Sequence, residues 1–81
     1  MFEQRRAIER SRASIAEGRR PMFHVVTTWD GSAVDVRIVE LPVIHLFVPD
    51  SASVVDGART LIARTLQVHP DSFTVELSRE R

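Results

Sequence analysis

Alternating apolar and polar positions predict four short strands in the last part of the chain. The first strand covers residues 23–28, which are mostly β-branched or aromatic, and the turn sequence Asp30-Gly31-Ser32 follows it. In residues 34–38, valine and isoleucine alternate with charged residues, so one face of this second strand is expected to be buried. Residues 43–48 form a third apolar run, and residues 73–77 alternate again.

One helix is predicted between the third and fourth strands. Its apolar face repeats at helical spacing and comprises Val54, Ala58, Leu61, Ile62 and Leu66. Ser51 or Ser53 is expected to cap it, because Ser53-x-x-Asp56 has the form of a capping box, and Pro70 stops it. Gly57 inside the helix costs about 1 kcal/mol relative to alanine, which predicts a close approach between helix and sheet. The sequence therefore predicts an α+β fold, a β-β-β-α-β module over residues 22–81.

An arm of helical propensity, residues 1–21, precedes this module. Its apolar stripe is thin, since only Met1, Ile8 and Ile15 recur at a spacing of seven. A helix with so little apolar surface is marginal alone. Ile8 and Ile15 are therefore expected to pack on the sheet or on a second subunit.

The arm is also the basic part of a chain whose formal net charge is zero. Residues 1–21 carry six arginines against three glutamates, whereas the rest carries five arginines against eight acidic residues. Arg5, Arg12 and Arg19 would lie seven apart on one side of a continuous helix, where they could contact nucleic-acid phosphates. The three glutamates partly compensate the positive charge of the arm, so packing is the favoured role of the arm.

The third strand indicates that the module leaves apolar surface of its sheet uncovered. Ile44, Leu46 and Val48 would face one side of the sheet, and Val43 and Phe47 the other, so both faces are apolar. An 81-residue domain buries only about 60–65% of its unfolded surface, and one helix covers one face. The second cover is expected to be the arm or another copy of the chain, most simply in a homodimer.

The sequence contains no recognisable set of catalytic or metal-binding residues. The three histidines lie at no short metal-ligand spacing, no phosphate-binding glycine loop occurs, and cysteine is absent, which is typical of a reducing, cytoplasmic compartment. No enzyme activity, cofactor or membrane span is expected. The interface candidates are large apolar or aromatic residues, with one histidine among apolar neighbours: Ile8, Ile15, Trp29, His45 and Phe47.

Residues 22–77 resemble the HicB-like antitoxin domain, in particular its short form in high-GC Gram-positive bacteria. The likeness rests on Trp29 near the first hairpin, Glu40-Leu41-Pro42 after the second strand, the helix entry Ser53-x-x-Asp56-Gly57-Ala58, and the closing segment from Val68 to Leu77. The resemblance implies a bacterial module that binds and masks a small HicA-type ribonuclease toxin, commonly as an oligomer, and is not itself a nuclease.

The chain departs from that family pattern in two places. Val43 stands where a glycine often follows the Leu-Pro pair, and no counterpart of the C-terminal DNA-binding segment of full-length antitoxins is found. The resemblance therefore leaves operator binding open. Two other functions stay open: an orphan oligomerisation domain, and nucleic-acid binding through the Arg-rich arm.

Overall fold

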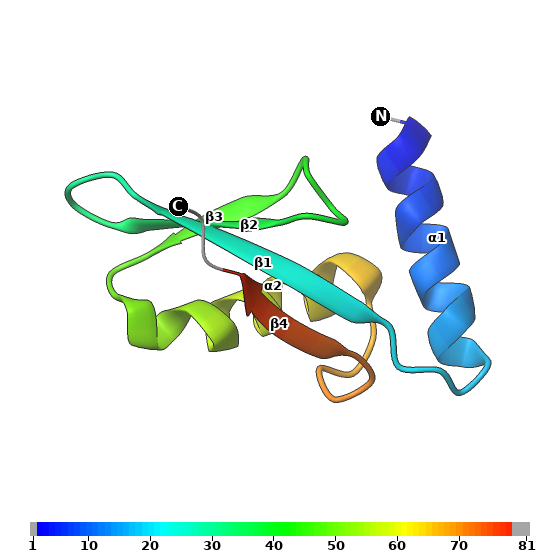
Figure 1. Ribbon diagram of the computed structural model, residues 1–81. Coiled ribbons are helices and arrows are strands. Elements are labelled where there is room, and N and C mark those ends of the chain that lie inside the picture. Colours follow the sequence, from blue (N-terminus) through cyan, green and yellow to red (C-terminus); the bar gives the residue numbers. More distant parts are fainter. Residues whose placement is uncertain (1, 79–81) are drawn as a thin grey trace.

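The computed structural model describes residues 2–78 and confirms the predicted α+β class and order of elements (Figure 1). Met1, the first residue of the predicted apolar stripe, lies outside the described residues. The elements are helix α1 (Phe2–Ala16), strands β1 (Met22–Trp29), β2 (Val34–Ile38) and β3 (His45–Val48), the 3-10 turn η1 (Ser51–Ser53), helix α2 (Val54–Leu66) and strand β4 (Thr74–Ser78).

The strands form one mixed sheet in the order β3-β2-β1-β4. β1 pairs with β2, and β2 with β3, in antiparallel hairpins. β4 returns beside β1 in parallel, with Met22 opposite Thr74 and Val26 opposite Ser78. A parallel neighbour requires a long crossover, which α2 supplies. The sheet therefore has two edges, β3 and β4.

Helix α2 covers one face of the sheet, and the core lies between them (Figure 1). The rings of Phe23 and Phe73 meet edge to face with their centroids 5.6 Å apart. Fully buried aliphatic side chains complete the core: Val25, Val36, Ile38, Leu41, Val54, Ile62 and Leu66. Leu61, predicted on the buried face, is only half-buried because it lies on the side of α2 that faces the edge strand β3.

The start of α2 corrects the predicted capping box. Ser53 has helical backbone angles and makes no side-chain capping bond, because the turn η1 already precedes α2. The side-chain cap belongs to η1 and is Asp50, whose backbone is extended and whose Oδ1 accepts hydrogen bonds from the backbone N–H of Ser53 at 3.0 Å and from its hydroxyl at 2.9 Å. The capping function therefore sits three residues earlier than the sequence pattern indicated.

Helix α1 is shorter than the predicted arm and packs beside α2, leaving the second face of the sheet uncovered (Figure 1). It ends at Ala16, and Gly18 adopts a left-handed backbone with φ of 86°. Ile8 and Ile15 are half-buried against the core, so the arm has a packing role within the chain. In residues 2–78, neither helix is long and apolar enough to cross a membrane.

Candidate functional site: the two sides of edge strand β3

Strand β3 has an apolar side chain on each side of the sheet. Val48 is buried and Leu46 half-buried on the side of α2, whereas His45 and Phe47 are exposed on the open face. The strand begins at His45, two residues later than predicted, because the chain is still in a turn after Pro42. The prediction of apolar residues on both faces holds for the last part of the run.

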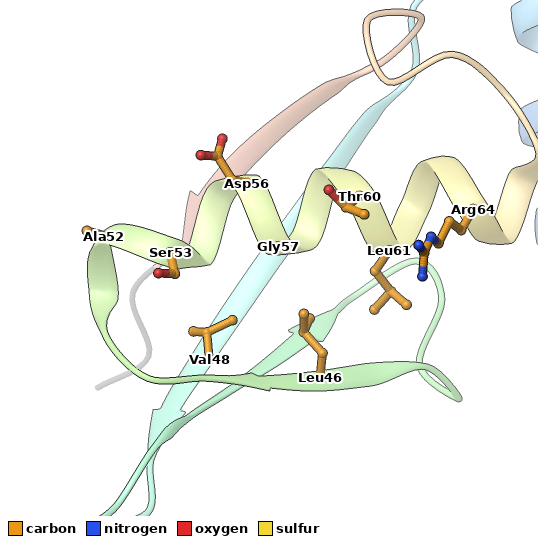
Figure 2. Close-up of a pocket in the computed structure, with 9 residues that line it drawn as sticks. All are labelled: Leu46, Val48, Ala52, Ser53, Asp56, Gly57, Thr60, Leu61 and Arg64. Atoms are coloured by element: carbon orange, nitrogen blue, oxygen red, sulfur yellow. The ribbon is translucent and has the colours of Figure 1, made fainter.

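A groove separates β3 from α2 on the covered side of the sheet (Figure 2). We call it the β3–α2 groove, and its volume is about 590 Å³. Its walls combine apolar side chains with a polar rim and consist of Leu46, Val48, Ala52, Ser53, Asp56, Gly57, Thr60, Leu61 and Arg64. This volume falls within the range of ligand-binding clefts, about 300–1,000 Å³.

Gly57 allows this close arrangement of helix and strand. A Cβ atom at this position would lie 3.1 Å from Leu46 Cδ1 and 3.2 Å from Val48 Cγ1, tighter than an ordinary van der Waals contact. The close approach predicted from a glycine inside the helix is therefore present, and it occurs at the wall of the β3–α2 groove.

On the open face, β3 presents an aromatic side chain beside a polar network. Asp35 Oδ2 accepts a hydrogen bond from Arg37 Nε at 3.0 Å, and its Oδ1 lies 3.3 Å from His45 Nδ1. The His45 ring in turn packs edge to face on Phe47, at a centroid distance of 5.6 Å. Phe47 nevertheless keeps 56% of its surface exposed. An exposed aromatic held in place by a fixed polar neighbour is suited to protein contact.

His24 forms a second ionic cluster on this face, which sequence reasoning missed. The backbone N–H of His24 donates to Glu40 Oε1 at 2.8 Å, its Nδ1 is hydrogen-bonded to Glu40 Oε2, and its Nε2 lies 3.8 Å from Glu76. The hydrogen bond and charge of Glu40, assisted by Glu76, raise the pKa of His24 above its ordinary value of 6.5. Glu40 and His24 are far apart in sequence, so no local spacing signalled their contact.

The other predicted site residues lie away from β3. Trp29 is 62% exposed at the end of the first hairpin, and Ile8 and Ile15 are engaged with the core through α1. Arg5 and Arg12 are exposed on α1, but Arg19 lies beyond the helix end and is paired with Glu17 at 3.0 Å. The predicted repeat of three arginines on one helical face is thus interrupted, whereas His45 and Phe47 lie side by side on the open face of β3.

Comparisons with protein-family models, with curated proteins and with solved structures gave no match. Among residues 2–78, no group of three histidine, aspartate or glutamate side chains is arranged as a metal site. The candidate site is therefore defined by the geometry of β3 and its neighbours alone.

Proposed function

We propose that this chain is a non-enzymatic protein-binding module that acts as a HicB-type antitoxin and masks a small HicA-type ribonuclease. The observation that carries the proposal is the edge strand β3, which offers Phe47 on the open sheet face and borders the β3–α2 groove on the other side. An unpaired edge with apolar pockets beside it is a common platform for a partner chain.

Several residues on which the HicB-like resemblance rests maintain the fold, and this supports a partner site on the exposed side chains of β3. Leu41 is buried in the core, Glu40 fixes His24, and Gly57 brings α2 onto β3. These roles maintain the module, and Gly57 also forms part of the wall of the β3–α2 groove. The exposed side chains of β3 are then available to contact a particular toxin. The residues that maintain the fold do not determine which toxin this is.

The test is direct inhibition of the toxin. We expect the gene next to that of this chain to encode a small basic protein that cleaves RNA, and the purified chain to abolish the cleavage at a stoichiometric ratio. Phe47→Asp should weaken the complex, measured by calorimetry, because it places a charge in the centre of the contact. Met22→Asp is the matched control, since Met22 is also an exposed apolar residue but lies on β1, away from β3.

Two results would count against the proposal. One is an RNA-cleaving neighbour whose activity persists in the presence of excess chain. The other is a complex that forms with unchanged affinity for Phe47→Asp and for variants of the β3–α2 groove, because binding would then occur on another surface.

A further inference from the structure

We infer that the β3–α2 groove binds an extended peptide segment of the partner as a fifth strand, with the pattern apolar-x-apolar-x-acidic read from its N-terminus to its C-terminus. This inference rests on the proposed function and specifies the chemistry of the partner. It combines three observations: the position of β3 at the sheet edge, the apolar walls of the groove, and the location of Arg64 at one end of it.

The edge position provides the backbone contacts. Within residues 2–78, β3 pairs with β2 alone, so the next strand position beside it is unoccupied. A segment added there would direct every second side chain towards α2, because side chains of a strand alternate between the two faces. These inward side chains would enter the β3–α2 groove between Leu46 and Leu61.

The walls of the groove select apolar side chains at two inward positions. Figure 2 shows Leu46 and Val48 pointing up from β3 and Leu61 pointing down from α2, with Gly57 on the helix above Leu46 and Val48. A side chain at position 57 would meet Leu46 and Val48, so the glycine lets α2 pack directly on β3 at this wall of the groove. Medium-sized aliphatic residues fit such a space, since their burial contributes without leaving a polar group unpaired.

Arg64 favours an acidic residue at the peptide position that faces it. Its guanidinium reaches down at the end of the groove remote from Val48, whereas the Asp56 carboxylate points away from β3 (Figure 2). Among the described residues, Arg64 has no hydrogen-bond or ion-pair partner. A carboxylate on the added strand would supply one, in the forked geometry that guanidinium groups favour.

The spacing follows from element geometry. Gly57 and Arg64 are seven residues apart on α2, about 10 Å along its axis. Inward side chains four residues apart on a strand are about 13 Å apart, so an apolar residue at Gly57 places the acid within reach of Arg64. β3 and α2 run in opposite directions along the groove (Figure 2). The more stable antiparallel addition to β3 therefore puts the acid on the C-terminal side of the apolar pair.

Arg64 also complements the negative end of the α2 dipole, and that role requires no ligand. The two roles differ in their prediction for a charge swap. A dipole role makes Arg64→Asp destabilising and leaves any peptide affinity unchanged, whereas the ligand role ties affinity to the sign of the charge on the peptide.

The experiment uses fluorescence anisotropy with a labelled nonapeptide, acetylated and amidated so that it has no terminal charge. The peptide carries valine at its third and fifth positions, glutamate at its seventh and serine or threonine elsewhere. We expect saturable binding to the full chain. A peptide with the same residues in reverse order should bind much more weakly, because its carboxylate meets the wrong end of the groove.

Protein variants then test each contact. Arg64→Asp should weaken binding of the glutamate peptide about fivefold to tenfold and should strengthen binding of a peptide with lysine at that position. Thr60→Trp, at an exposed position on the groove rim, should block both peptides. Arg20→Asp is the matched control, because Arg20 is an exposed arginine between α1 and β1 and its reversal should change neither affinity.

Three results would overturn the inference. The first is no binding of the glutamate peptide up to about 1 mM, which is a very weak affinity for a recognition site. The second is binding that is indifferent to peptide direction, to Arg64→Asp and to Thr60→Trp. The third is sedimentation showing that Arg64→Asp dissociates a dimer while no peptide binds, which would assign the groove to a second copy of the chain.

These outcomes are separable from the fate of the proposed function. If the RNA-cleaving neighbour is inhibited but inhibition is unaffected by Arg64→Asp, the antitoxin function stands and the peptide inference fails. If the peptide binds as expected but no neighbouring ribonuclease is inhibited, the groove is a peptide site and the HicB-type function fails.

Discussion

At the scale of single residues, His24 links stability to pH. The hydrogen bond and the charge of Glu40 raise the pKa of His24 above 6.5, so folding favours the protonated imidazole. The stabilisation is therefore fully present below pH 6.5 and is lost as the pH rises through the raised pKa of His24. Since His24 joins β1 to the segment after β2 and faces β4, its effect should appear in global unfolding.

We expect Glu40→Gln to lower the free energy of unfolding at about pH 6 and to have a much smaller effect at a pH above the raised pKa of His24, where the imidazole of the wild type is neutral. Urea denaturation at the two pH values measures this. Glu76→Gln is the control, because Glu76 lies 3.8 Å from the ring and should give a weaker version of the same pattern. A loss that is equal at both pH values would show that Glu40 acts without His24.

Gly57 both lies close to the side chains of β3 and lines the β3–α2 groove. Gly57→Leu should lower the free energy of unfolding by about 1–3 kcal/mol, because its side chain would be forced against Leu46 and Val48. Thr60→Leu changes a neighbouring exposed position of the same groove and should leave stability nearly unchanged. Equal stabilities of the two variants in urea would mean that α2 does not approach β3 as closely as described.

At the scale of elements, α1 acts as a packed part of the fold. Replacing both Ile8 and Ile15 by Asp should lower the free energy of unfolding by about 2–5 kcal/mol, because two half-buried aliphatic side chains would become charged. Circular dichroism during thermal melting measures the loss. Arg5→Asp with Arg12→Asp is the control on exposed positions of the same helix. An unchanged melting point in the isoleucine variant would show that the arm does not support the module.

Elements were largely predictable from local patterns, and their arrangement was not. The alternation around Val36 and the turn at Asp30 determine a hairpin through short-range rules, and the apolar face of α2 appears at its own period. The capping residue was misplaced because Asp50 acts through a 3-10 turn that the spacing rule does not include. Leu61 packs against the core, as its periodicity indicates, but it is only half-buried. Periodicity identifies a helix face without revealing that part of it borders a groove at a sheet edge.

The candidate site was only partly predictable for a related reason. His45 and Phe47 could be selected, because a histidine and an aromatic residue in an apolar edge run are unusual for a fully covered strand. The contact of His24 with Glu40 and the position of Arg64 at the groove depend on chain segments brought together by the sheet order. Those contacts are set by tertiary structure, and residues close together in the sequence give no sign of them.

At the scale of the whole molecule, the uncovered sheet face predicts self-association. Val43 and Phe47 expose 64% and 56% of their surfaces near the β3 edge, and α1 does not cover this face. We expect a dimer in sedimentation equilibrium, and a shift towards monomer for Phe47→Asp. The Arg20→Asp variant should sediment like the wild type. A wild-type chain that remains monomeric at high micromolar concentration would contradict the prediction.

The parallel pairing of β4 with β1 also sets the order in which the native contacts can form. Val25 meets Ile38 across one hairpin, whereas Met22 meets Thr74 only after the intervening strands and α2 have been placed. Closing so long a loop has a larger entropic cost, so the three-stranded meander should form before β4 docks. The free edge of β1 is then exposed in the intermediate. In native-state hydrogen exchange, amides of β4 should open at lower free energy than those shared by β1 and β2.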